Sequence, residues 1–347
     1  MMKPGIRLGL AVCTVVFTAS TLPLAAQEAK EPKVRTVAAE LDNPCGLAVH
    51  PGTRTVFIST HPAIYQLTSN NGLKLHTVVK GFTTDVYGKG PKYNLGPLGL
   101  AFLDDETLVV GDGSKPDGEE YVLVFKVSGE PPTKAQKPGD AVQVLGPIKA
   151  GKDSANGEGN FYAIAVSEKA IFVTSNGDDT KGWVLKAERN GSKLGELKPG
   201  IATKLATEVD APVGITMSKD GKELIVAQMG EINIPGDSLY TTYDPESGEL
   251  KAKLKTGLND IAGIAVSPKT GKIYAVDFSW VDTSKGGLFR LDIEGEEVKT
   301  EKILSLDKPS ALAFDPEDGS LYISILGTAE EGSDKAPGKV LKVEPGL

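Results

Sequence analysis

Polar side chains flank a recurring pair of short apolar runs, and their oxygens could bind a ligand or a metal ion. One set stands just before the first run of each pair: Asn43, Asn94, Asn160, Asp210, Asn259 and Asp260. A second set stands at the end of the second run: His61, Asp112, Asn176, Gln228 and Asp277. Converging carboxylate and amide oxygens suit a hard cation such as Ca²⁺. The alternative is that these residues cap turns through bonds to the backbone.

Aromatic residues fall in or beside the same segments, and they indicate a second kind of site. They are Tyr87, Tyr93, Phe161, Tyr162, Phe278 and Trp280. Exposed aromatic rings with amides and carboxylates nearby suit a sugar or a peptide. The alternative is that the rings fix the loops to the ends of the sheets.

Histidine and cysteine chemistry is sparse in this chain. Of the three histidines, only His61 falls beside the other candidate residues, where it could act as an acid or base. No two histidines have the spacing of a zinc site, and no Gly-x-Ser-x-Gly motif is present. Cys45 lies in an apolar run, which is typical of a small buried side chain.

A sixfold repeat must position all of these residues. Each copy has a short apolar run centred on a small residue, then a tight turn and a second apolar run. The central residues are at positions 46, 99, 163, 214, 263 and 311, a period typical of propeller blades. In the fifth copy, the expected strands are 261–266, 273–277, 288–292 and 297–306. The repeat therefore predicts an all-β, six-bladed β-propeller of four-stranded antiparallel blades.

The ends of the chain predict how the ring closes. The sixth copy stops after its third strand, whereas residues 33–40 have an outer-strand pattern and no blade of their own. We therefore expect the N-terminal strand to complete the sixth blade. The loops expected on one face are longer, notably 83–96, 147–160 and 278–287, and long loops commonly carry function.

The repeat resembles six-bladed propellers of the NHL and SMP-30/gluconolactonase-like type, in the wider TolB-like group. The likeness covers about residues 33–347 and rests on strands such as Pro97-Leu98-Gly99-Leu100-Ala101-Phe102 followed by a tight turn. In the SMP-30-type lactonases, oxygen ligands for a metal stand just before the strand glycine. The residues at that position here are Cys45, Leu98, Tyr162, Val213, Ala262 and Ser310. This departure argues against a lactonase-type metal site.

The N-terminus predicts export from the cytoplasm. Lys3 and Arg7 precede an apolar run over residues 8–26, which is the pattern of a secretory signal peptide; an uncleaved anchor is the alternative. We expect residues 27–347 to form a single propeller domain that is secreted or periplasmic. Without Lys3 and Arg7 the charge becomes 36 − 46 = −10, which excludes nucleic acid as a partner.

These observations favour a monomeric binding module over an enzyme. We expect its long-loop face to bind a small molecule, glycan, peptide or protein, without a membrane span after signal cleavage. The first alternative is a Ca²⁺-assisted hydrolase of the lactonase type, and the second is a scaffold without a small ligand.

Overall fold

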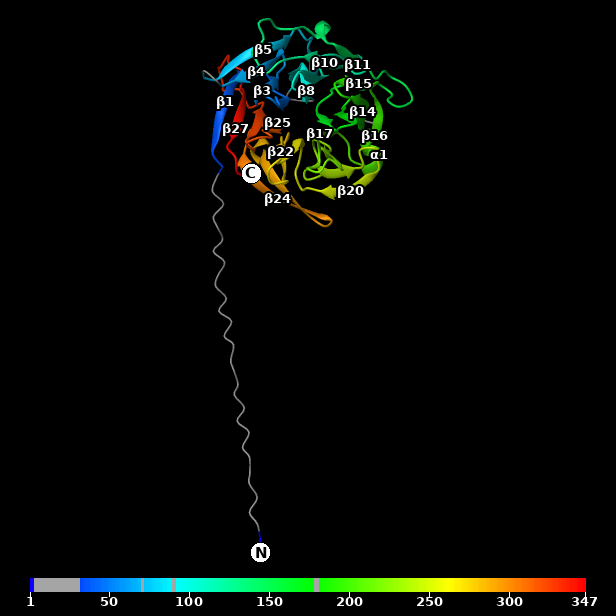
Figure 1. Ribbon diagram of the computed structural model, residues 1–347, viewed down its shortest axis with the longest axis vertical. Helices are drawn as coiled ribbons and strands as arrows, with labels where there is room; N and C mark the ends of the chain where they lie inside the picture. Colours follow the sequence, from blue (N-terminus) through cyan, green and yellow to red (C-terminus); the bar gives the residue numbers. More distant parts are fainter. Residues whose placement is uncertain (3–31, 70–71, 89–91, 178–180) are drawn as a thin grey trace. The chain divides into compact units, whose positions relative to one another are not determined.

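The computed structural model describes residues 1–2, 32–69, 72–88, 92–177 and 181–347. The predicted signal peptide, apart from residues 1–2, lies outside these described residues. Over the described part of residues 32–347, the strands form six antiparallel sheets arranged as a ring (Figure 1). None of the helices in the described ranges is both long and apolar enough to cross a membrane.

The first two strands of each blade follow the predicted repeat. The innermost strands are β2 (Leu47–Val49), β8 (Pro97–Asp104), β12 (Ile164–Val166), β17 (Pro212–Met217), β21 (Ile261–Val266) and β25 (Pro309–Phe314). The second strands are β3 (Val56–Ser59), β9 (Thr107–Asp112), β13 (Ala170–Thr174), β18 (Leu224–Gln228), β22 (Ile273–Asp277) and β26 (Leu321–Ile325). The second strands are almost wholly buried, because both of their faces pack against neighbouring blades.

The third and fourth strands complete the blades toward the rim. The third strands are β4 (Ala63–Thr68), β10 (Val122–Lys126), β14 (Trp183–Asn190), β19 (Leu239–Tyr243), β23 (Gly287–Glu294) and β27 (Gly338–Val343). The outer strands are β5 (Lys74–Lys80), β11 (Gln143–Leu145), β16 (Lys198–Ala202), β20 (Leu250–Lys255), β24 (Glu297–Ser305) and β1 (Val34–Leu41). The outer edges are charged and exposed, as in β24, which discourages pairing with other chains.

The N-terminal strand closes the ring, as the sequence predicted. β1 pairs antiparallel with β27, with Val34 opposite Val343 and Leu41 opposite Gly338, and the two strands lie side by side in Figure 1. Val37 and Leu41 are buried in a cluster that joins the sixth blade to the first. The sixth blade therefore contains both ends of the described ring.

An ion-pair cluster adds a second link across the same seam. Arg54, in the turn between β2 and β3, donates through Nε to Asp315 Oδ2 at 2.8 Å and also pairs with Asp318. The Asp315 side chain is only 1% exposed, so it depends on Arg54 and on nearby backbone N–H groups for its partners. These contacts join the first blade to the turn between β25 and β26.

Hydroxyl groups join neighbouring blades near the axis. The Ser59 hydroxyl accepts from the Gly46 N–H at 2.7 Å and donates to the Leu98 carbonyl of the next blade at 2.5 Å. Thr174 repeats this pattern, accepting from the Ala163 N–H and donating to the Val213 carbonyl at 2.9 Å. Each hydroxyl therefore satisfies one backbone donor and one backbone acceptor in neighbouring blades.

Several short elements were not predicted from the sequence. The loop into the second blade contains a hairpin of β6 (Asp85–Tyr87) and β7 (Tyr93–Leu95). The third blade has an additional strand, β15 (Lys193–Leu194), and is followed by the short helix α1 (Thr203–Thr207). Single 3₁₀ turns cover Pro138–Asp140 and Thr283–Lys285. Of these elements, the hairpin matters most for the candidate site.

Removal of β1 should destabilise the whole ring. A chain that begins after Leu41 loses the β1–β27 pairing and the burial of Val37 and Leu41. We expect its unfolding temperature to fall by at least about 10 °C relative to a chain that begins at Pro32. Thermal unfolding followed by circular dichroism checks this, and equal unfolding temperatures would show that β1 is not needed for closure.

Candidate functional site

A pocket with a cavity volume of about 90 Å³ opens at the axis, and one residue of each blade forms its floor. These floor residues are Cys45, Leu98, Tyr162, Val213, Ala262 and Ser310. They occupy the sequence position just before the small residue of each copy. The residues that stand here in place of the oxygen ligands of SMP-30-type lactonases therefore line the pocket.

Backbone irregularities turn the floor residues toward the axis. In β17, β21 and β25 the pairing register shifts directly after the first residue, and Val213, Ala262 and Ser310 lie at these bulges. A bulged residue leaves the regular ladder and points its side chain in a new direction. Cys45 and Tyr162 lie two residues before the first residue of their inner strands, β2 and β12.

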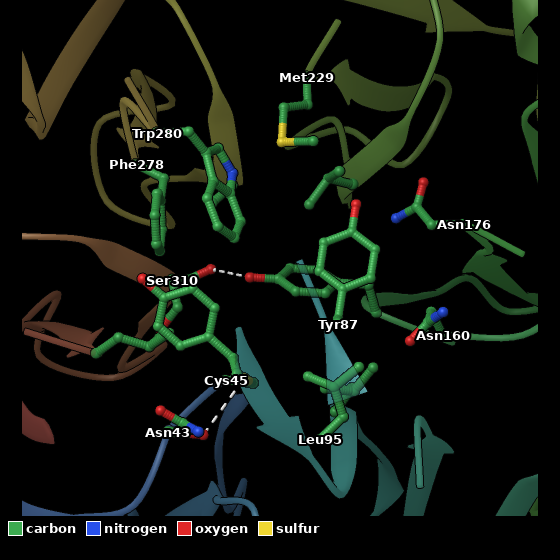
Figure 2. A pocket seen from close by; sticks show the side chains of 16 residues that line it. Asn43, Cys45, Tyr87, Leu95, Asn160, Asn176, Met229, Phe278, Trp280 and Ser310 are labelled. Atoms are coloured by element: carbon green, nitrogen blue, oxygen red, sulfur yellow. Dashed lines mark hydrogen bonds between the residues drawn. The ribbon is translucent and has the colours of Figure 1, made fainter. Parts of the chain in front are cut away.

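One hydrogen bond crosses the floor between opposite blades. The Tyr162 hydroxyl, from the third blade, donates to the Ser310 carbonyl of the sixth blade at 2.8 Å. Figure 2 shows this bond as the dashed line that ends at Ser310. Burial raises the pKa of Tyr162 well above its usual value, so the hydroxyl remains a donor. The tyrosine thereby forms part of the base of the pocket.

Aromatic rings form one wall. The β6–β7 hairpin contributes Tyr87 and Tyr93, and the loop after β22 contributes Phe278 and Trp280. Tyr87, Phe278 and Trp280 are labelled in Figure 2. Phe278 and Trp280 stack with ring centroids 4.4 Å apart, and Tyr93 meets Trp280 edge to face at 5.5 Å. Tyr87 contacts Trp280 in the same way at 6.3 Å. These contacts hold the rings in mutually favourable orientations.

Two buried carboxyl groups fix the loop that carries Trp280. Asp277 accepts from the backbone N–H groups of Asn259 and Ser279, and Asp260 accepts from the Trp280 N–H at 2.7 Å. Burial, and secondarily the nearby charge of Asp277, raises the pKa of Asp260 to about 7. Both side chains therefore support the aromatic wall from behind.

Three amides provide the polar part of the lining: Asn43, Asn160 and Asn176. Asn43 and Asn160 each lie two residues before a floor residue, and both have left-handed backbone conformations with φ of 45° and 48°. Asparagine tolerates this conformation better than most residues. Asn43 Nδ2 donates to the Asn94 carbonyl at 3.1 Å.

The pocket lining has no charge. Among the described residues that line it, none is Asp, Glu, His, Lys or Arg. Leu95, Met229 and Leu326 add apolar side chains, and Ser310 and three tyrosines add hydroxyl groups.

The structure brings four of the predicted binding residues together and places seven elsewhere. Asn43, Asn160, Asn176 and Trp280 line the pocket. The other seven, which do not line it, are His61, Asn94, Asp112, Asp210, Gln228, Asp260 and Asp277. A binding role for these seven stays a prediction, and the structure shows what each contacts.

Most of the seven bind neighbouring parts of the chain. His61 Nδ1 lies 2.7 Å from Asp42 Oδ2, and its Nε2 lies 2.9 Å from the Thr84 hydroxyl. Gln228 Nε2 donates to the Thr207 hydroxyl at 2.9 Å, and Asp210 pairs with Lys204. Asp112 accepts from the Ser114 N–H at 3.0 Å. Asn94 meets Asn43 through its carbonyl rather than through its side chain.

The structure also shows the surroundings of Phe161 and Cys45. Phe161 is buried in the hydrophobic cluster between the second and third blades, so it fixes the structure there. Burial raises the pKa of the Cys45 thiol to about 12, so that the thiol stays protonated and is a poor nucleophile.

Sequence reasoning missed Leu95, Met229 and Leu326. Met229 and Leu326 directly follow the last residues of β18 and β26, as Phe278 follows β22. An apolar residue directly after the second strand of the last three copies was therefore a usable signal for the pocket wall. Leu95 belongs to the unpredicted hairpin, and its position had no such signal.

A buried acid holds Asn160 in place. Glu120 is fully buried, and its Oε2 accepts the Asn160 backbone N–H. Gly159 leaves the room for this carboxyl, because a Cβ at position 159 would lie 2.0 Å from Glu120 Oε2. Burial raises the pKa of Glu120 to about 9, so the carboxyl is mostly protonated near neutral pH.

The donor set does not fit the calcium site of a lactonase-type enzyme. Ca²⁺ takes six to eight oxygen ligands, commonly including carboxylates, whereas the described lining residues offer three amides and the hydroxyl groups of Ser310 and three tyrosines, but no carboxylate. Within the described ranges, no group of three or more His, Cys, Asp or Glu residues is arranged to hold a metal.

Comparison with known proteins identifies the fold. No family model matches the chain, and no curated protein matches its sequence. A gluconolactonase from Xanthomonas campestris has a similar structure, with a TM-score of 0.57, 15% identity and coverage of 90% of each chain. Soluble aldose sugar dehydrogenase from Escherichia coli has a TM-score of 0.58 and 13% identity, covering 90% of this chain and 99% of that one.

A calcium-binding protein, regucalcin, from Agrobacterium tumefaciens is also similar. Its TM-score is 0.53 at 13% identity, with coverage of 90% of this chain and 94% of that one. These likenesses confirm that the chain is a six-bladed β-propeller with the fold of the SMP-30-type proteins. At such low identity they show the fold alone.

The buried Glu120 carboxyl should make stability depend on pH. Because its pKa is raised from 4.5 to about 9, the folded state holds a proton that the unfolded state releases between these values. The unfolding free energy should therefore fall as pH rises through this window. Glu120→Gln removes the ionisation, so its unfolding temperature relative to wild type should increase by about 5 °C between about pH 5 and about pH 9.

The matched control for this prediction is Glu119→Gln, because Glu119 is the exposed neighbour of Glu120. Its difference from wild type should stay constant over the same pH range. A constant difference for Glu120→Gln as well would show that Glu120 does not titrate in this window.

Proposed function

We propose that this protein is a secreted or periplasmic binding protein whose axial pocket takes an uncharged, mostly apolar small molecule that contains a ring. The observation that carries the proposal is the uncharged lining of five aromatic side chains, aliphatic side chains and three amides. Export rests on the signal peptide predicted over residues 1–26, and we propose that the protein acts as a monomer.

The balance of polar and apolar groups favours such a ligand over a sugar. A buried polar group without a hydrogen-bond partner costs about 1–3 kcal/mol. A monosaccharide has several hydroxyl groups, and the three amides and few other polar atoms of the lining would leave some of them unpaired. An apolar ring instead contacts the Phe278–Trp280 pair and Met229 without losing hydrogen bonds to water.

The pocket chemistry also favours binding over catalysis. Cys45 is protonated, and the Ser310 hydroxyl already donates to the Pro44 carbonyl at 2.6 Å. No described lining residue is a carboxylate or histidine that could activate either group. A binding role therefore requires nothing beyond the groups that are present.

Calorimetry with simple compounds tests this proposal. We expect 1-naphthol to bind the wild-type protein at one site, and methyl β-D-glucopyranoside to bind much more weakly. Trp280→Ala should weaken 1-naphthol binding by about tenfold, because it removes the stacked wall. Trp183→Phe is the matched control, since Trp183, the other tryptophan, does not line the pocket.

Other results would contradict the proposal in distinct ways. Tighter binding of the glucoside would favour a glycan-binding protein. Binding of neither compound would favour a scaffold, and equal effects of the two tryptophan substitutions would place the binding site elsewhere.

A calcium titration separates the binding protein from a metal-assisted hydrolase. Because none of the described residues that line the pocket is a carboxylate, we expect millimolar Ca²⁺ to leave the unfolding temperature unchanged within about 1 °C. Mg²⁺ at the same concentration controls for ionic strength. A rise of several degrees with Ca²⁺ but not with Mg²⁺ would support the hydrolase instead.

A further inference from the structure

The side-chain oxygen of Asn160 is an unused hydrogen-bond acceptor in the pocket lining. Asn160 Oδ1 is buried, and it has no hydrogen-bond partner among the described residues. The amide nitrogen of the same side chain donates to Asp117 Oδ1 at 3.4 Å. Rotating the amide by half a turn would place its oxygen against a carboxylate, so the observed orientation is favoured.

The backbone around Asn160 is fixed independently of any ligand. Its N–H is bound by Glu120, its φ is 48°, and Gly159 packs closely against the Glu120 carboxyl. These contacts lie behind the pocket wall, so the position of the acceptor is set before binding. An acceptor held in place in this way can discriminate between ligands more sharply than a mobile one.

A second amide lies on the same side of the pocket. The Asn176 side chain makes no hydrogen bond to a described residue, whereas its backbone N–H donates to the Gly159 carbonyl at 3.1 Å. Figure 2 shows Asn160 and Asn176 together on the side opposite Phe278 and Trp280. Two of the three pocket amides therefore lie together, across the pocket from the stacked Phe278–Trp280 pair.

We propose that the Asn160 oxygen makes the pocket selective for ring compounds that carry a hydroxyl group, either alcohols or phenols. This inference rests on the proposed function and narrows it to one ligand class. The hydroxyl donates to Asn160 Oδ1 and accepts from the Asn176 amide, while the ring lies against Phe278 and Trp280. A ligand without a donor leaves Asn160 Oδ1 buried and unpaired, which weakens its binding.

The test compares 1-naphthol with 1-methoxynaphthalene by calorimetry. The two compounds share a ring system and an oxygen, but only 1-naphthol is a donor. The measured quantity is the dissociation constant of 1-methoxynaphthalene divided by that of 1-naphthol. We expect this ratio to be about tenfold larger in the wild type than in Asn160→Gly. Comparing this ratio between proteins cancels the different solubilities of the two compounds.

The control is Asn190→Gly. Asn190 is an exposed asparagine that does not line the pocket, so this variant should keep the wild-type ratio. Glycine suits the left-handed conformation of Asn160. Asn160→Ser provides a second variant that removes the acceptor, and it should match Asn160→Gly.

The outcomes separate this inference from the function on which it rests. Equal ratios in the wild type and in both Asn160 variants would overturn the selectivity, although binding of both compounds would still support the pocket. A loss of preference in Asn190→Gly as large as in Asn160→Gly would also overturn it. Binding of neither compound to the wild type would contradict the proposed function itself.

Discussion

Each sheet of this ring depends on both of its neighbours for burial of its apolar side chains. Over the described residues, six hydrophobic clusters each combine side chains from two adjacent blades. No blade has a separate core of its own, so a break between any two blades would expose one face of both. This explains why the seam between the sixth and first blades carries two kinds of link, the β1–β27 ladder and the Arg54–Asp315 contact.

Closure of the ring also determines what the axis can contain. Six inner strands converge there, and at each of them a bulge or a strand start directs one residue toward the pocket. These positions are equivalent in the sequence repeat, but their side chains differ. The chemistry of the floor therefore depends on one residue per blade, of which Ala262 also belongs to the cluster between the fifth and sixth blades.

The sequence predicted the features that repeat. The spacing of the small residues predicted the number of blades, and the unpaired pattern at 33–40 predicted the closing strand, because both follow from burial and strand pairing. The identity of the floor positions was also visible. Each of these features leaves a periodic trace in the sequence, which the candidate site as a whole does not.

The polar residues could not be sorted from the sequence, because the same residue types cap turns and line pockets. The sequence places both Asp277 and Asn176 near the end of a second apolar run. In the structure Asp277 is the last residue of β22 and accepts from backbone N–H groups, whereas Asn176 lies two residues after β13 and lines the pocket. What separates them is the local loop geometry, and it depends on contacts between distant segments. The hairpin that carries Tyr87 and Tyr93 was equally hidden, since it lies inside a long loop outside the repeat.

The buried acid beside Asn160 connects stability with recognition. Ionising the Glu120 carboxyl inside the fold costs free energy. The carboxyl nevertheless binds the Asn160 N–H, which the left-handed backbone of Asn160 keeps out of the regular β-ladder. Because burial raises its pKa to about 9, the group can remain neutral while it holds Asn160. Burying Glu120 costs free energy, and in return the carboxyl fixes the position of the Asn160 acceptor in the pocket. An apolar residue at position 120 would pack without this cost, but the Asn160 N–H would lose its partner, and the polar end of the pocket would lose the support that fixes its geometry.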